Sequence, residues 1–444
     1  MKAVTSMFAQ TAARADFLRR GVLSAAAAAL LAGAAPHATA QPEAEAEELY
    51  DPVAIHLYWR QDPTTTMLID WQTLEDQERD TVVQYRPTGT EEWSTQTGDT
   101  HPFPYSERTI HRVELTGLEP GTKYDFRFGE DSMDYKFRTM PEDATRPIRI
   151  AFGGDTRHSQ EMMERTNYQA MLYDPDFVAW GGDLAYADGR EDRVDRWYEW
   201  YDAIKNTLIT PEGRVIPALV GIGNHEVRQF FYFNHADYEE TDEFRAQIAP
   251  YFFGLFDWPG QPGYDVLDFG DYMSIIMLDT DHANAVGGTQ TEWLEEVLAE
   301  RQDVPHVFPV YHVTAYPSHR AYDHQVNVRI REHWVPLFEQ YGIEVAFENH
   351  DHTYKRTHPI RGGEVDPSGV VYIGDGAWGV GTRQVHDPEE TWYLKRAESV
   401  RHFILGTIHD THRHFLMVDE EGNVIDEYPE TPQPRWNGAE AGED

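Results

Sequence analysis

Residues 177–186 read FVAWGGDLAY, a short apolar run that ends in two glycines and an aspartate. Residues 148–155, IRIAFGGD, show the same pattern earlier in the chain. After Pro141 such apolar runs alternate with helical patterns, which indicates layers of sheet and helix of the α/β or α+β class. The glycines let the backbone turn sharply where each strand ends. Both stretches therefore predict a strand that delivers a carboxylate to its carboxyl end.

Three further apolar runs end in Asn or His: 215–222 before Gly-Asn-His-Glu, 307–311 before His312, and 345–347 before Asn-His-Asp-His. Strand carboxyl ends line the functional edge of such sheets, so we expect these side chains to converge. Oxygen and imidazole donors suit Fe, Zn or Mn. Seven are too many for one tetrahedral ion but suit two ions that share a bridging ligand. They are Asp155, Asp183, Tyr186, Asn224, His312, His350 and His352.

The composition restricts the possible partners. The chain has 444 residues, enough for two or three domains with a sizeable core. Its 77 acidic and 37 basic residues give a formal charge of −40, which disfavours nucleic acid or an anionic membrane as a partner. Because the chain has no cysteine, thiolate metal sites, Cys nucleophiles and a disulfide-linked dimer are excluded. The oligomeric state is otherwise left open.

Residues 1–40 are typical of an export signal. Basic residues precede an alanine-rich apolar run from Val22 to Ala35, and Ala38-Thr39-Ala40 offers a cleavage site. The apolar run is too short for a membrane span, so none is expected in the mature chain. Arg19-Arg20 resembles a twin-arginine motif, and an ordinary Sec signal is the alternative route. Either route predicts a periplasmic or extracellular protein.

The rest of the chain is expected to form two domains. An acidic linker at 41–50 precedes strand-like runs over 51–140, separated by Pro, Gly and Asp as in a small β-sandwich. Within it, LEPGTKY looks like the tyrosine corner of fibronectin type III domains, with Tyr124 as the corner residue. The second domain extends over 145–430, where Thr289-x-x-Glu292 predicts a capping box. Residues 431–444 are expected to form a flexible tail.

The order GD…GDxxY…GNHE…H…HxH resembles the metallophosphoesterases, and specifically the purple acid phosphatases. The resemblance covers most of residues 51–430, because a fibronectin-like domain before the catalytic one is also this family's arrangement. It implies an α+β fold, with an N-terminal fibronectin III-like β-sandwich followed by a metallophosphoesterase βαβ sandwich. The two sheets of that second sandwich would be flanked by helices.

The resemblance also implies a ferric ion and a divalent Zn, Mn or Fe ion, with roles for eight residues. Asp155, Tyr186 and His352 would bind the ferric ion; Asp183 would bridge both ions; Asn224, His312 and His350 would bind the divalent ion. His225 would face the substrate and protonate the leaving group or stabilise the phosphate. The implied reaction is hydrolysis of a small phosphate monoester by a metal-bound hydroxide. A phosphodiesterase or nucleotide hydrolase with the same metal site is the alternative.

The sequence departs from the family pattern next to the first aspartate. Arg157 stands where many metallophosphoesterases have a metal-binding His and where purple acid phosphatases usually have Gly. A guanidinium has no lone pair to offer, so Tyr186 would take the vacant position, with His158 as the rival ligand. Asn349 likewise replaces a Gly that usually precedes the HxH motif.

Candidate substrate contacts are less defined than the metal ligands. The residues after His312 differ from the family's plant members, so His319 or His324 would have to replace the histidines found there. Arg157 and Arg356 are either phosphate contacts or solvated surface charges.

Each of these residues alone also has a structural explanation. Asp155 and Asp183 could cap the helices that follow them, and Asn224 could be a turn residue. A non-enzymatic alternative makes the fibronectin-like domain a binding or adhesion module. A substitution of Asp183 would distinguish the two classes of function. The binding module would keep its function, and the hydrolase would lose it.

Overall fold

The computed structural model describes residues 49–430, which belong to one compact unit. The predicted export signal at 1–40, almost all of the acidic linker and the predicted tail at 431–444 lie outside the described residues. Within residues 49–430, no helix combines the length and the apolar character that crossing a membrane requires.

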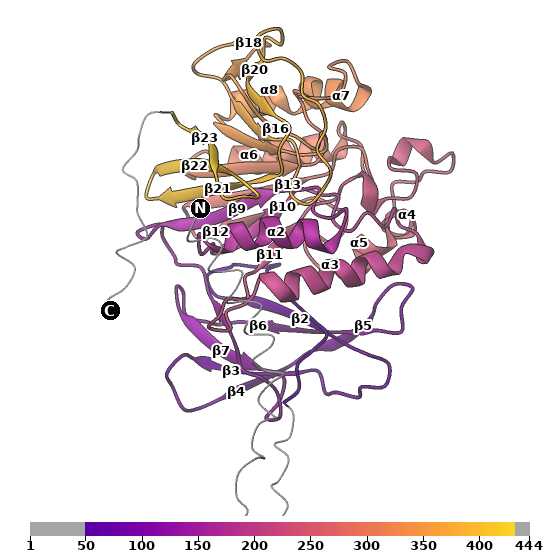
Figure 1. Ribbon diagram of the computed structural model, residues 1–444, viewed down its shortest axis with the longest axis vertical. Helices are drawn as coiled ribbons and strands as arrows, with labels where there is room; N and C mark the ends of the chain where they lie inside the picture. The colour runs from indigo at the N-terminus through magenta and orange to yellow at the C-terminus, as the bar shows by residue number, and fades with distance from the viewer. Residues whose placement is uncertain (1–48, 431–444) are drawn as a thin grey trace, which may run out of the picture. The chain divides into compact units, whose positions relative to one another are not determined.

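The N-terminal region is a sandwich of two antiparallel four-stranded sheets (Figure 1). One sheet has the order β1 (Ala54–Tyr58), β2 (Met67–Thr73), β6 (Thr109–Leu115) and β5 (Asp99–Pro102). The other has the order β4 (Ser94–Thr97), β3 (Val82–Pro87), β7 (Lys123–Arg127) and β8 (Tyr135–Arg138). The tyrosine corner is confirmed, because the backbone N–H of Glu119 donates to the Tyr124 hydroxyl at 2.8 Å. Sequence patterns did not predict β4 and β5, since β4 is polar and fully exposed and β5 is polar and largely exposed.

The second region contains two mixed sheets. The first has the order β11 (Ala218–Val220), β10 (Phe177–Trp180), β9 (Ile148–Gly153), β21 (His402–His409), β22 (His412–Asp419) and β23 (Val424–Tyr428). The second has the order β12 (Asp265–Phe269), β13 (Met273–Leu278), β14 (His306–Tyr311), β15 (Val345–Glu348), β19 (Val371–Gly374), β16 (Tyr354–Thr357) and β20 (Leu394–Glu398). The rings of Phe152 and Phe347 stack at 3.9 Å, so side chains of the two sheets meet in a shared core.

Helices flank these sheets, as the α+β prediction requires. On the first sheet lie α2 (Gln160–Met171) and α3 (Val194–Thr207), which run beside each other in Figure 1. The remaining helices are α4 (Asp242–Ile248), α5 (Pro250–Leu255), α6 (Thr289–Glu300), α7 (Gln325–His333) and α8 (Val335–Gln340). A common apolar cluster joins α6, α7 and α8 to β13 and β14 of the second sheet. The predicted two-sheet architecture with flanking helices is confirmed.

The predicted capping box at the start of α6 is wrong. Thr289 is the first helical residue, Gly288 at φ +83° precedes it, and no side chain caps the helix. The helix itself forms because Leu294, Val297 and Leu298 share a face that packs against the second sheet.

The sandwich and the second region share a buried contact at His56 in β1. Its Nε2–H donates to the Ala218 carbonyl of β11 at 2.9 Å, and its ring stacks on Tyr58 and meets Trp200 of α3 edge-on. The predicted boundary at 140–145 falls between β8 and β9. Because both regions belong to one compact unit, their division into separate domains stays a prediction.

His56 should make the free energy of unfolding depend on pH. Burial lowers the pKa of His56 to about 4, and its Nδ1 has no hydrogen-bond partner. The unfolded chain takes up a proton near pH 6.5, whereas the folded chain does so only near pH 4. Stability is therefore lost as the pH falls through this window, by about 3 kcal/mol at most.

The variant His56→Gln should lose that part of the pH dependence, which urea unfolding between pH 7.5 and 4.5 would measure. His101→Gln, in the more open strand β5, is the matched control and should keep the wild-type dependence. An unchanged pH dependence in His56→Gln would show that this histidine does not supply the effect.

Candidate metal centre

Five strands bring the seven predicted donors to one place. Asp155 follows β9, Asp183 and Tyr186 follow β10, Asn224 follows β11, His312 follows β14, and His350 and His352 follow β15. All seven residues are buried. The convergence expected from strand ends is therefore present in the structure.

Asp155, Tyr186 and His352 form one group of donors. The Tyr186 hydroxyl donates to Asp155 Oδ1 at 2.8 Å and lies 3.1 Å from His352 Nε2. His352 Nε2 lies 2.9 Å from the same Asp155 oxygen. Three donor atoms thus point at a common space.

The second group is built around Asp183 and His312. His312 Nε2 lies 3.2 Å from Asp183 Oδ2, 3.1 Å from Asn224 Oδ1 and 3.1 Å from His350 Nδ1. Donor atoms of Asp183, His312 and His350 all lie within 4.8 Å of one another, and so do those of Asp155, Asp183 and His352. Asp183 belongs to both sets. Such spacings suit donors arranged around ions at about 2.1 Å, with Asp183 shared between two ions.

The backbone takes an unfavourable conformation at several donors. Asp155, Asp183, Tyr186, His350 and His352 have φ values of +55°, +53°, +59°, +81° and +59°. Non-glycine residues rarely adopt this left-handed region, and where they do the strain is often tied to a functional site. The surrounding packing therefore has to hold these turns.

Close packing around Asp155 depends on glycine. A Cβ at Gly376 would lie 1.8 Å from Asp155 Oδ2 and 2.6 Å from the backbone nitrogen of His350. His350 N–H donates to that same oxygen at 2.8 Å. Asn349 occupies the space beside Gly154 and Gly181, where a Cβ would lie 2.5 Å and 2.1 Å from its amide group. The amide also donates to the Tyr311 carbonyl, so this departure from the family pattern is built into the packing.

A buried glutamate holds the turn that carries Asp183. Glu226 accepts hydrogen bonds from the backbone N–H groups of Asp183, Leu184 and Gly223, each at 2.8 Å. Burial and the nearby Asp183 carboxylate raise the pKa of Glu226 to about 7. The Gly-Asn-His-Glu motif therefore supplies a support for the Asp183 turn as well as candidate site residues.

Proton and charge distribution in the centre follow from the two carboxylates. Burial opposes protonation of His312, but the Asp183 and Asp155 carboxylates outweigh it and raise the pKa of His312 to about 9. Despite burial, the neighbouring imidazoles of His312 and His225 hold the pKa of Asp183 below its usual range. Burial and the charge of Arg320 lower the pKa of His350 well below its usual value. Cations binding here would therefore displace a proton from His312.

His225 differs from the seven buried donors in its exposure. About a quarter of its side chain is exposed (26%), and its Nε2 lies 3.9 Å from Asp183 Oδ2. Its Nδ1 lies 2.5 Å from Asp188 Oδ1, and Asp188 in turn pairs with Arg193. The ring is thus oriented by a carboxylate at the edge of the centre.

The structure places the predicted substrate contacts elsewhere or gives them other partners. The Arg157 guanidinium pairs with Glu199 of α3 and donates to the Ala185 carbonyl at 3.3 Å. His319 Nδ1 bonds the Gln384 carbonyl at 2.7 Å. His324 precedes α7 and contacts Asn327.

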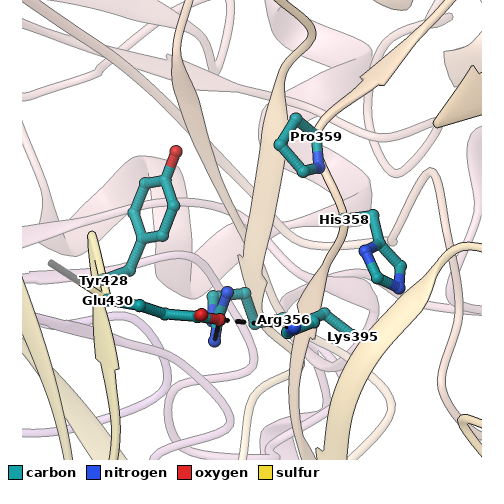
Figure 2. A pocket seen from close by; sticks show the side chains of 6 residues that line it. All are labelled: Arg356, His358, Pro359, Lys395, Tyr428 and Glu430. Atoms are coloured by element: carbon teal, nitrogen blue, oxygen red, sulfur yellow. Dashed lines mark hydrogen bonds and ion pairs between the residues drawn. The ribbon is translucent and has the colours of Figure 1, made fainter. Parts of the chain in front are cut away.

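Arg356 lies in a separate pocket of about 250 Å³ (Figure 2). Its guanidinium donates to Asp426 at 2.8 Å and to Glu430 at 3.0 Å, and Glu430 also lies 3.6 Å from Lys395. Arg356 lies four positions after His352, within strand β16, which leads away from the turn that carries the HxH motif. None of the contacts of Arg356 within residues 49–430 involves a metal-ligand candidate.

Sequence patterns did not single out two arginines beside the centre. Arg320 donates to the His350 carbonyl at 2.6 Å, and the backbone N–H of Arg383 donates to the His352 carbonyl at 3.0 Å. Both lie on loops with no motif of their own. The rival ligand His158 accepts a hydrogen bond from Gly381 N–H at its Nδ1, and it belongs to neither donor set.

Comparisons with known proteins find relatives of both regions of the chain. Residues 52–139 match the family described as "Purple acid Phosphatase, N-terminal domain". Purple acid phosphatase 18 of Arabidopsis thaliana is 28% identical over 334 residues, covering 69% of this chain and 67% of the relative. The chain is therefore similar to purple acid phosphatases in its N-terminal region and over most of its length. Purple acid phosphatase 21 of the same plant is 28% identical over 62% of this chain and 60% of its own length.

A solved structure supports the same fold. Purple acid phosphatase PPD1 from yellow lupin (Lupinus luteus) seeds superposes with a TM-score of 0.69 at 20% identity, covering 85% of this chain and 73% of that chain. Purple acid phosphatases are metallophosphoesterase hydrolases with a binuclear metal centre, and the donor sets that share Asp183 fit such a centre. No Arg or Lys among residues 49–430 forms an ion pair with Asp155 or Asp183, so their charges are available to cations.

Gly376 should be required for metal binding at the Asp155 group. In Gly376→Ala the new Cβ would displace the Asp155 carboxylate, and we expect a fall in metal affinity of roughly ten- to a hundredfold. Metal content after dialysis against graded chelator would measure this. The control Gly362→Ala has the same backbone strain, with φ +61° against +62°, but open space around the Cβ. Equal affinities in the two variants would contradict the packing argument.

Proposed function

We propose that this protein is an exported binuclear metallohydrolase that cleaves phosphate monoesters. The observation that carries the proposal is the pair of buried donor sets that share Asp183. Export is supported by the basic, apolar and small-residue pattern of residues 1–40, which leaves the twin-arginine and Sec routes open.

In this proposal Asp155, Tyr186 and His352 hold a ferric ion. Burial and the Asp155 carboxylate raise the pKa of Tyr186 well above its usual value, so the phenol stays protonated without a strongly charged partner. A trivalent ion offsets that penalty better than a divalent one. Asn224, His312 and His350 hold the divalent ion, for which Zn, Mn and Fe are the candidates. When bound, the two ions supply a hydroxide nucleophile and stabilise charge on the phosphoryl group.

His225 is the proposed general acid. It is the partly exposed imidazole at the edge of the donor sets, so it can reach a leaving-group oxygen outside the metal ligands. Asp188 fixes the ring through Nδ1, which leaves Nε2 to face the site. Asp188 is therefore a positioning residue in this mechanism.

Metal content and activity measured together would test the proposal. We expect two ions per chain, and turnover of p-nitrophenyl phosphate well above that of bis-p-nitrophenyl phosphate. The variant Asp183→Asn should lose nearly all phosphatase activity, because it removes the ligand shared by the two ions. The control Asp279→Asn removes an equally buried carboxylate that bonds backbone N–H groups and belongs to neither donor set. It should keep two ions per folded chain. Active enzyme with fewer than two ions per chain would refute the mechanism.

A ferric ion on Tyr186 should also give the protein a visible absorption band. Tyr186→Phe should abolish the band while the fold persists, because the change removes one hydroxyl. A fully metallated, active and colourless wild-type protein would instead assign Zn or Mn to both positions.

Removing the carboxylate behind His225 should impair the acid step. In Asp188→Asn we expect kcat to fall roughly ten- to a hundredfold with KM little changed, because the His225 ring loses the carboxylate that orients it. A substrate with a good leaving group should be less affected than phenyl phosphate. Asp192→Asn, an exposed carboxylate paired with Arg190, is the control. Equal losses for both leaving groups would place Asp188 outside the proton-transfer step.

A further inference from the structure

Arg320 has a fixed guanidinium group at the edge of the metal centre. Its Nη1 donates to the His350 carbonyl at 2.6 Å and to Asp351 Oδ1 at 2.8 Å. The buried Asp351 carboxylate also accepts the backbone N–H groups of His319 and Arg320, at 2.7 and 3.1 Å. This arginine is therefore anchored beside the HxH motif while 27% of its side chain remains exposed.

Arg383 has a second guanidinium beside the first. Its backbone N–H bonds the His352 carbonyl at 3.0 Å, and its Nη1 reaches the His350 carbonyl, also contacted by Arg320, at 3.5 Å. No carboxylate of residues 49–430 forms an ion pair with this half-buried side chain. Arg320 thus pairs with Asp351, whereas Arg383 lies in the field of the Asp155 carboxylate without an ion pair of its own among the described residues.

The loop that carries Arg383 passes directly beside the donors. Gly381 N–H donates to His158 Nδ1 at 3.1 Å, and the His158 ring lies 4.8 Å from the Tyr186 ring and 5.4 Å from the His352 ring. Farther along the loop, His386 Nε2 bonds the Arg320 carbonyl at 2.9 Å. The two arginines therefore lie on loops that are tied to each other and to the centre.

We propose that Arg320 and Arg383 form an anion subsite that binds a second phosphate group, one on the leaving group of the substrate. This inference rests on the proposed phosphatase function and names its substrate class: monoesters with a further phosphate, rather than esters of neutral alcohols or phenols. Guanidinium groups pair with phosphate oxygens through parallel hydrogen bonds, and a doubly charged group matches two guanidiniums better than a carboxylate does. In a chain of charge −40, such a pair is a local point of attraction for anions.

Matched aryl substrates would test the subsite in the metal-loaded enzyme. We expect kcat/KM to be higher for benzene-1,4-bisphosphate than for phenyl phosphate, with 4-carboxyphenyl phosphate between them. In Arg383→Gln the bisphosphate-to-phenyl ratio should fall roughly ten- to a hundredfold, and Arg383→Lys should recover part of it. Arg361→Gln removes the same charge from an exposed arginine of the hairpin β17 (Ile360–Arg361) and β18 (Glu364–Val365), and it should leave the ratio unchanged.

Calorimetry provides a readout that does not depend on turnover. Benzene-1,4-bisphosphonate should bind the metal-loaded protein more tightly than phenylphosphonate, and Arg383→Gln should remove most of the difference. An unchanged ratio and an unchanged binding difference would overturn the subsite. An equal loss for both substrates would also overturn it, because Arg383 would then act on the transferred phosphoryl group. Wild-type protein without any esterase activity would refute the proposed function, while the binding comparison would still decide the subsite.

Discussion

The site depends on two carboxylates, Asp155 and Asp183, that are fully buried without any Arg or Lys partner among the described residues. A buried carboxylate is costly unless it is neutralised or coordinates a cation. Backbone N–H groups, imidazoles and the Tyr186 hydroxyl satisfy their hydrogen bonds, and the protonated imidazole of His312 offsets only part of their charge. Sharp left-handed turns, a glycine beside Asp155 and the Glu226 support all keep these two groups in place. The structure is therefore organised for cations that it must acquire.

A neighbouring cluster shows the opposite case. Lys355, Glu348 and Asp375 have no exposed side-chain area, and the Lys355 ammonium pairs with both carboxylates. The Tyr311 hydroxyl donates to Glu348 at 2.7 Å. Burial raises the pKa of Asp375 well above its usual value, so a protonated Asp375 leaves one ammonium against one carboxylate. The cluster thus joins β15, β16 and the loop after β19 with its charge balanced internally. Uncompensated charge, rather than burial of charge, distinguishes the metal centre from its surroundings.

The sequence predicts the donors because each one lies within a few residues of the end of an apolar strand. In the fold, the ends of five such strands from two sheets meet at one place. The sequence does not predict the functional residues whose positions depend on loops. Arg320 and Arg383 meet only through the fold, and no pattern near either marks them. Arg356 lies close to the HxH motif in sequence, but strand β16 carries it to another pocket. The polar strands β4 and β5 escaped prediction for a related reason, since they have no apolar face.

The overall charge of −40 and a site for phosphate anions are compatible because they act over different distances. At physiological ionic strength the field of surface carboxylates is screened over about 8 Å, so it mainly opposes the approach of an anionic substrate. Within the centre, buried groups are screened much less. There the donor sets concentrate positive charge once ions are bound, and the two guanidiniums add to it at the edge. Selectivity for polyanionic substrates would then be decided by a few fixed groups against an unfavourable general field, and not by the net charge of the protein.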